Sequence, residues 1–161
     1  RFPKLAIFVL MFLKLHHFFP KIKAYRNYLM KDFDYTSDRV VDQIMGACMV
    51  MPKKSIENIG LLDERYWIWF EEVDWCKRAV ASGMTVWFSP SGQIIHHGGV
   101  SFSAAFVPIR KEWRFMNSAL RYTLKHMGLS SFCLLLVFVP IGLFIDGFSF
   151  LVWFKHKQQA T

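Results

Sequence analysis

Residues 66–78 read YWIWFEEVDWCKR and place three carboxylates, Glu71, Glu72 and Asp74, among aromatic and aliphatic side chains. An unpaired buried carboxylate is costly, so each of these groups must be hydrogen-bonded, paired with a cation or placed in a cleft. Apolar side chains recur at helical spacing from residue 70 until Gly83, so the three acids begin a predicted helix. The helix dipole favours negative charge there. The stretch is therefore either a chemical centre or an ordinary acidic helix start.

Around this helix the sequence predicts short strands and helices, which indicates an α/β fold class. A strand is expected over residues 40–51, with Gly46 as a bulge or a point of close backbone approach. A helix is expected from Ser55 to residue 58 or 59, ended by Gly60. Two more strands are expected over residues 84–88 and 93–95.

Three helical patterns flank this central part. Residues 5–15 are apolar on almost every side, and residues 110–127 form an amphipathic, basic pattern that suits a membrane surface or packing on the rest of the protein. Residues 132–154 are long enough to span a bilayer and hold one charge, Asp146. Because a carboxylate in hydrocarbon is costly, a kinked span and a re-entrant pair of short helices both stay open.

Composition separates a soluble part from a membrane-associated part. The 161 residues are 53% hydrophobic and carry a formal net charge of +8, and basic residues bracket the apolar block. This arrangement favours membrane lipid over nucleic acid as the partner. The three cysteines have no metal-type spacing and indicate free thiols in a reducing compartment. The start lacks a signal-peptide cleavage pattern, and the sequence is expected to be a fragment.

The expected organisation has four parts. They are an N-terminal helical segment and linker over residues 1–39, a central part over 40–107, an amphipathic basic helix over 108–128, and a hydrophobic membrane-associated segment with a basic tail over 129–161.

Four motifs in order carry a family resemblance. They are VDQIMGACMV at residues 41–50, GLLDERY at 60–66, WFEEVDWC at 69–76 and HHGGVS at 96–101. Together they resemble the carboxyl-terminal half of family 2 glycosyltransferases, and most closely the rhamnosyltransferase-like members. The resemblance implies a partial glycosyltransferase A-type fold, in which residues 40–107 are the acceptor-binding half, followed by the amphipathic and membrane-associated helices.

The resemblance also implies roles for the acidic residues. The acidic pair before the helix falls on Glu71 and Glu72, and its second member is the base that deprotonates the acceptor hydroxyl in an inverting sugar transfer. The family commonly has an aspartate there, and Glu72 is one methylene longer. Asp74 is expected beside it as a catalytic-site residue that orients the loop or contacts substrate. His96 corresponds to a metal ligand in some members, and imidazole is a suitable ligand.

Four further residues are expected to line the substrate site. Gly46 and Ala47 correspond to the segment that lines the sugar site, where small side chains leave room. Trp67 and Trp69 offer stacking faces for a sugar ring, and Glu71 is expected to contact substrate. Because residues 66–70 alternate, one aromatic set is expected to face the cleft and the other the core.

The implied partners are a nucleotide-sugar donor, a glycan or lipid-linked acceptor, and membrane lipid. The implied cofactor is a divalent metal, Mg or Mn, held mainly by an N-terminal half whose paired-aspartate motif is not in this sequence. The expected location is the cytoplasmic face of the inner cell membrane, in cell-surface polysaccharide or glycolipid synthesis. Two alternatives stay open: a non-catalytic membrane-anchored module, and a hydrolase that binds metal through Glu71, Glu72, Asp74 and His96.

Overall fold

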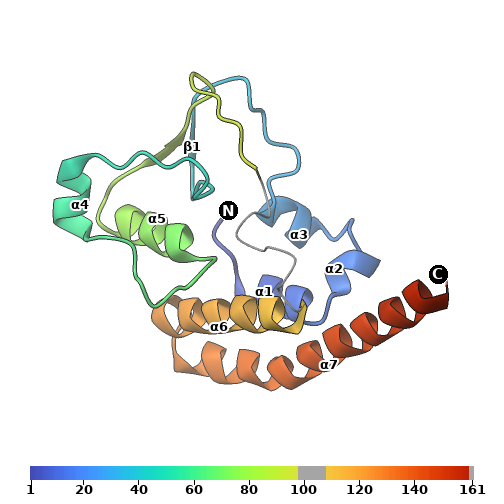
Figure 1. Cartoon of the computed structure of the whole chain (residues 1–161). Helices are drawn as coiled ribbons and strands as arrows, with labels where there is room; N and C mark the ends of the chain where they lie inside the picture. Colours follow the sequence, from blue (N-terminus) through green and yellow to red (C-terminus); the bar gives the residue numbers. More distant parts are fainter. Residues whose placement is uncertain (98–107, 160–161) are drawn as a thin grey trace. The chain divides into compact units, whose positions relative to one another are not determined.

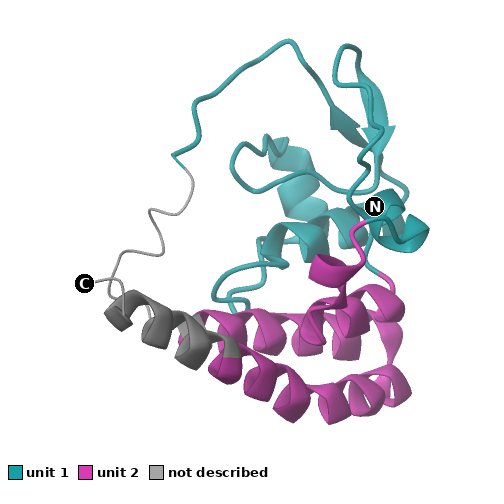
Figure 2. Ribbon diagram, turned by 90° about the vertical axis from the view of Figure 1, so that its right-hand side faces the viewer, with its two compact units in different colours: residues 1–3, 21–98 teal, residues 4–20, 99–161 magenta. Residues whose placement is uncertain are grey.

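The structure is a computed structural model that describes residues 1–97 and 108–159, and the side chains of residues 1–97 and 110–148. Residues 98–101 of the fourth motif, residues 102–107 of the central part and the side chains of the basic tail lie outside the described residues. The chain divides into two compact units (Figure 2). Unit 1 comprises residues 1–3 and 21–98, and unit 2 comprises residues 4–20 and 99–161.

Unit 1 is a mixture of short helices and one small sheet (Figure 1). Its elements are α3 (Lys23–Tyr28), β1 (Arg39–Val41), α4 (Lys53–Ile59), α5 (Glu71–Ala81) and β2 (Val86–Phe88). Strands β1 and β2 are antiparallel, and Val41 lies opposite Val86. These two valines pack with Cys76 of α5 in a buried cluster. The sheet is therefore anchored on α5.

The strand expected over residues 40–51 is wrong beyond Val41, because β1 ends there and a loop follows. The start of the chain binds this loop through side chains: the amide of Phe2 donates to Asp42 at 3.0 Å, and Nε2 of Gln43 donates to the carbonyl of Arg1 at 2.9 Å. Such bonds compete with a strand ladder. The strand expected over residues 93–95 is also wrong, and its Ile95 is 87% exposed.

The helix boundaries set by glycine are confirmed. Helix α4 ends at Gly60, whose φ is +86°, and α5 is followed by Gly83, whose φ is +85°. A left-handed φ is easy for glycine and strained for other residues. Helix α4 begins two residues before the expected Ser55, after Pro52.

Unit 2 is helical in its described residues. It contains α1 (Leu5–Phe12), α2 (Leu15–Phe18), α6 (Pro108–Met127) and α7 (Leu129–Gln159), and Figure 1 shows α6 and α7 side by side. Gly128, with a φ of +86°, joins them. Aromatic contacts hold α1 on α6: Phe8 lies 5.9 Å from Tyr122 and Phe12 lies 6.2 Å from Phe115, measured between ring centroids.

Two expectations for the helices of unit 2 change. The helix expected over residues 5–15 breaks at Lys14, whose φ of +55° turns the chain and brings its ammonium 2.8 Å from Glu112 and 3.3 Å from Asp146. The pair of re-entrant helices is wrong, because α7 is one helix that continues through Pro140. By length and composition alone, Leu129–Phe148 is the one stretch of the described chain that could cross a membrane.

Altogether the described residues form a mixed helical chain with a two-stranded sheet and one apolar C-terminal helix. This architecture is compatible with a partial α/β fold.

Candidate functional site

The candidate site lies in unit 1, where the chain enters α5. Trp69 and Phe70 both have left-handed backbones, with φ of 63° and 70°. Such a conformation costs about 1–3 kcal/mol per bulky residue and tends to occur where a functional geometry requires it. Burial of Phe70, which is 4% exposed, helps to hold the turn. The turn fixes the direction in which the acidic first turn of α5 begins.

Glu72 lies against the loop that follows β1. A Cβ atom built on Gly46 would lie 3.7 Å from the Cβ atom of Glu72, so the loop backbone directly contacts this side chain. One helical turn later, Cys76 is fully buried, and Ile44 packs against the cluster that Cys76 forms with Val41 and Val86. The two contacts place one face of α5 on residues 44–46. The distance at Gly46 is an ordinary van der Waals contact, so it does not establish the close backbone approach that was one of the two sequence-based interpretations of this glycine.

The environment of Glu72 makes its carboxyl group a stronger base. Burial raises the pKa of Glu72, and the negative charge of Glu71 raises it further. Hydrogen bonds from the backbone of Glu72, Val73 and Gly46 act in the opposite direction. The net result is a pKa above the ordinary value of 4.5. A raised carboxyl pKa is a common property of catalytic bases.

Three buried acceptor oxygens in this region have no hydrogen-bond partner among the described residues. They are Oε2 of Glu72, Oε2 of Glu71 and Oε1 of Gln43. Buried polar atoms are nearly always satisfied in folded proteins, so an exception requires an explanation. A bound molecule that donates hydrogen bonds, such as one with hydroxyl groups, would satisfy them.

Two residues of this site escaped sequence reasoning. Gln43 interacts with the phenol of Tyr28 in α3, and burial, the main cause, together with the charges of Tyr25 and Glu72 raises the pKa of Tyr28 to about 12. Tyr28 is therefore a neutral phenol near Glu72. Gln43 falls within the first quoted motif and could have been singled out there, whereas nothing local in the sequence marks Tyr28.

Asp74 occupies the opposite side of α5 from Glu72, because residues two apart in a helix point in nearly opposite directions. It is fully buried, and Nε of Arg78 donates to its Oδ2 at 2.9 Å. Arg78 in turn donates to the carbonyls of Ile59 at 2.6 Å and Leu61 at 2.8 Å. Asp74 thus links α5 to the end of α4, which fits the expected role of orienting a loop.

The aromatic run divides only in part as the alternation predicted, because Ile68 and Trp69 are both half-buried. Tyr66 and Phe70 are buried at 6% and 4% exposure, whereas Trp67 is 59% exposed. Trp69 is half-buried, and so is Ala47, which follows Gly46 in the loop. An exposed indole can stack on a sugar ring, and a substrate contact of either tryptophan stays a prediction.

His96 has an exposed side chain. Among the described residues, no group of three or more histidine, cysteine, aspartate or glutamate side chains could hold a metal ion. The described residues therefore do not fit a divalent metal by themselves, and within them the arrangement of Glu71, Glu72, Asp74 and His96 that a hydrolase would need is not formed.

Taken together, these side chains provide a proton acceptor at a constrained helix start. Glu72 has a buried oxygen without a partner among the described residues and a raised pKa, and it lies beside the loop that contains Gly46. A carboxylate of this kind can accept a proton from a hydroxyl group.

Comparison with known proteins gives one partial relationship. The chain is 31% identical over 61 residues to proteins from two strains of Mycobacterium tuberculosis that are named N-acetylglucosaminyl-diphospho-decaprenol L-rhamnosyltransferase. The match covers 38% of this chain and 20% of the relatives, so it spans about a fifth of their length. No family profile and no solved structure match the chain.

Proposed function

We propose that this chain is the acceptor-side part of a glycosyltransferase, with Glu72 as the base that activates the acceptor hydroxyl. The observation that carries the proposal is the buried, partnerless Oε2 of Glu72, whose carboxyl group has a raised pKa at the start of α5. The partial similarity to named rhamnosyltransferases supports a glycosyltransferase function. The four motifs and their order support membership of family 2.

The proposed reaction is an inverting sugar transfer. Glu72 takes the proton of the acceptor hydroxyl while the oxygen of that hydroxyl forms a bond to the anomeric carbon of the donor sugar. The bond between that carbon and the diphosphate breaks on the opposite side, and the nucleoside diphosphate leaves with the electron pair. Gly46 and Ala47 leave room for the sugar, and Glu71 and Gln43 accept hydrogen bonds from its hydroxyl groups.

The donor, acceptor and location are part of the same proposal. The donor is a nucleotide sugar, and the acceptor is a glycan or a lipid-linked sugar at the cytoplasmic face of the cell membrane. The relatives' name includes a diphospho-decaprenol, which supports a lipid-linked acceptor. A divalent metal would be held mainly by residues outside this sequence.

The test compares two glutamate-to-glutamine variants of the full-length protein. Glu72→Gln should reduce the rate of sugar transfer by about 100-fold or more, the usual contribution of a general base, and leave nucleotide-sugar binding unchanged. Glu64→Gln, at an exposed position of unit 1, is the matched control and should transfer normally. Wild-type turnover by Glu72→Gln would remove Glu72 from the base role.

A non-catalytic membrane-anchored module is the second candidate, because the outer side of α7 is apolar. In that case neither the wild-type full-length protein nor any variant would transfer sugar. Measurement of transfer by the wild-type protein therefore separates the two functions before the variants are compared.

A further inference from the structure

We propose that unit 2 docks on the surface of a membrane with anionic lipids, with α7 in the plane of the membrane and one of its sides inserted into a single leaflet. The inference concerns the outer face of α7, which comprises Leu129, Cys133, Val137, Ile141, Phe144 and Phe148. It does not depend on the proposed sugar transfer.

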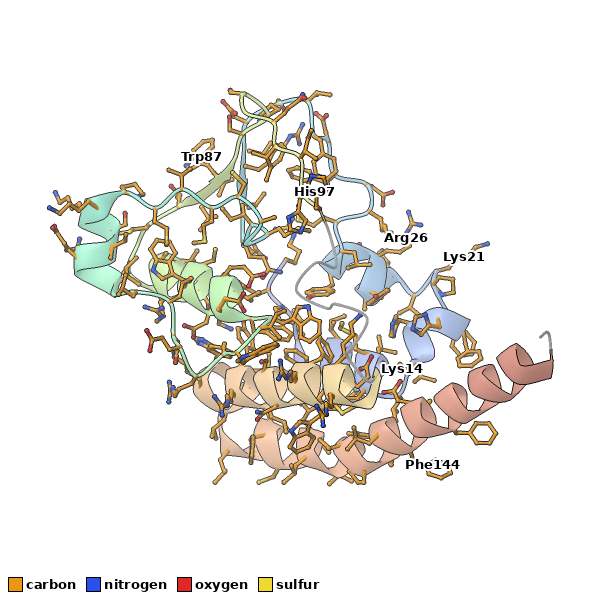
Figure 3. The ribbon with its side chains drawn as sticks, viewed as in Figure 1. Lys14, Lys21, Arg26, Trp87, His97 and Phe144 are labelled. Carbon is orange, nitrogen blue, oxygen red and sulfur yellow. The ribbon has the colours of Figure 1, made fainter. Side chains whose placement is uncertain are left out.

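The outer face is apolar and exposed along the described part of the helix. Val137 is 61% exposed, Phe144 74% and Phe148 61%. Figure 3 shows Phe144 on the side of α7 that points away from α6. A helix at a water-facing surface normally turns polar residues outward, so this face is unsuited to water.

The opposite side of α7 is the packed one, and it carries the only charge of the described apolar stretch. Leu135 and Val139 are buried there, and Gly142 lies against Met116 of α6. Asp146 falls on the same side and pairs with Lys14 at 3.3 Å. The helix therefore buries its carboxylate and exposes its hydrocarbon, which is the arrangement expected of a helix in contact with lipid.

Crossing of the bilayer by α7 is disfavoured by its neighbour α6. The two helices are joined at Gly128, they touch where Met116 meets Gly142, and Lys14 bridges Glu112 to Asp146. Almost all of the stretch Leu129–Phe148 is therefore paired with α6. If this stretch crossed the membrane, α6 would have to enter the hydrocarbon with it.

Helix α6 carries exposed basic residues that cannot enter hydrocarbon cheaply. They are Arg110, Lys111, Arg121 and Lys125, which lie along the length of the helix. The sequence of unit 2 has more basic than acidic side chains, since its side-chain carboxylates are those of Glu112 and Asp146. The basic excess complements anionic headgroups, so α6 is best placed at headgroup level.

The helical stripe of α6 that lies next to α7 also suits a position at the level of the lipid headgroups. Trp113 is 50% exposed and Leu124 is 47% exposed, and both share a helical stripe with Met116, which touches α7. Tryptophan is enriched at the boundary between headgroups and hydrocarbon. From the leaflet toward water, the proposed order is therefore the apolar outer face of α7, then the Trp113 stripe of α6, and then the basic residues of α6.

The decisive experiment measures the depth of spin labels along α7 in vesicles of phosphatidylcholine and phosphatidylserine. Labels are placed singly at Cys133 and, with Cys133→Ser, at V137C, F144C and F148C, all with Cys48→Ser; Cys76 is fully buried and does not compete for the label. Collision rates with oxygen and with a water-soluble nickel chelate should give one common, shallow depth.

A helix that crosses the bilayer gives a different profile. Residues 133 and 148 are separated by about 22 Å along a helix axis, so labels in a crossing helix would span about that range of depth and overturn the proposal. Labels that stay in water in the presence of vesicles would also overturn it. So would labels that are shielded without vesicles and broaden one another, because a second copy would then cover the face.

Two valine-to-glutamate variants test the surface itself. Val137→Glu should weaken binding to the same vesicles about tenfold or more, because a carboxylate replaces an inserted side chain. Val50→Glu makes the same change at a site in unit 1 that is 86% exposed and should bind as the wild-type chain does. Equal binding by Val137→Glu and wild type, or undiminished binding of the wild type to vesicles without phosphatidylserine, would contradict the proposal.

Discussion

The two sides of α5 handle buried carboxylates differently. On one side Asp74 is fully buried but is matched by Arg78, which also binds the carbonyls of Ile59 and Leu61. On the other side Glu72 lies against Gly46, has no cationic partner among the described residues and keeps one buried oxygen without a hydrogen bond. The two residues are two positions apart and chemically alike.

The comparison shows that the role of a carboxylate in an acidic cluster depends on its hydrogen-bond and ion partners and not on its position in the sequence. A carboxylate whose hydrogen bonds are made within the protein contributes to the fold, and its charge is neutralised. A carboxylate that is desolvated without such partners has an unfavourable desolvation free energy. Ligand binding or uptake of a proton can reduce that free energy. Stability should therefore depend on Asp74 and chemistry on Glu72.

The largest expected change in stability comes from Asp74. Asp74→Ala should lower the free energy of unfolding by about 3 kcal/mol or more, because it removes the fully buried carboxylate and leaves the half-buried guanidinium of Arg78 without its counter-ion. The matched control is Asp32→Ala, which removes an Asp–Arg pair of nearly equal length, 2.8 Å, from an aspartate whose side chain is 80% exposed. The control should change stability by about 0.5 kcal/mol or less. Urea unfolding of both variants measures the two losses in free energy of unfolding. Equal losses for Asp74→Ala and Asp32→Ala would contradict the structural role of Asp74.

Substitution of Glu72 should change the free energy of unfolding by a smaller amount than substitution of Asp74, and should raise it. The folded protein holds the Glu72 proton more tightly than the unfolded chain does, so the ionised carboxylate opposes folding at every pH above the ordinary pKa of 4.5. Glu72→Gln should therefore raise the free energy of unfolding near pH 7, by about 0.5–2 kcal/mol as is usual for a stabilising substitution. Well below pH 4.5 both states of the wild type are protonated, and the gain should vanish.

Unfolding curves across this pH range test the assignment. A loss of stability at neutral pH would mean that the carboxylate of Glu72 is stabilised by a partner in the folded protein. Glu64→Gln should show no such pH dependence, because its side chain is exposed.

The smallest effect is expected from the glycine that faces Glu72. A methyl group at Gly46 would make only ordinary contacts, the nearest at 3.7 Å, so Gly46→Ala should change stability by about 0.5 kcal/mol or less. The same substitution at Gly142 would place a Cβ atom 2.7 Å from the carbonyl oxygen of Phe12 and should cost about 1–3 kcal/mol. Thermal unfolding of the two variants compares them, and a large loss for Gly46→Ala would contradict the loop geometry.

Local signals predicted much of the fold. Helical spacing and glycine stops identified α4, α5 and α6 to within a few residues, because these boundaries depend on residues close in sequence. The strand that was extended to residue 51 failed because Asp42 and Gln43 bond to residues 1 and 2, which are distant in sequence. The break at Lys14 has the same origin, since its ion partners lie on α6 and α7.

The candidate site was predictable only in part. The quoted motifs identified Glu72 and Gly46, and the structure brings these two together. Tyr28 could not be found, because it reaches Glu72 through tertiary packing of α3. The sequence could not separate Asp74 from Glu72 either, since the difference is set by Arg78 and by the end of α4.

The central claim is tested most directly by sugar transfer in the full-length protein with Glu72→Gln and Asp74→Asn, each measured with the folded fraction known from unfolding curves. The account predicts that Glu72→Gln stays folded and loses about 100-fold or more of kcat, whereas the loss in Asp74→Asn follows its folded fraction. Normal kcat in folded Glu72→Gln, together with a large loss in folded Asp74→Asn, would contradict it.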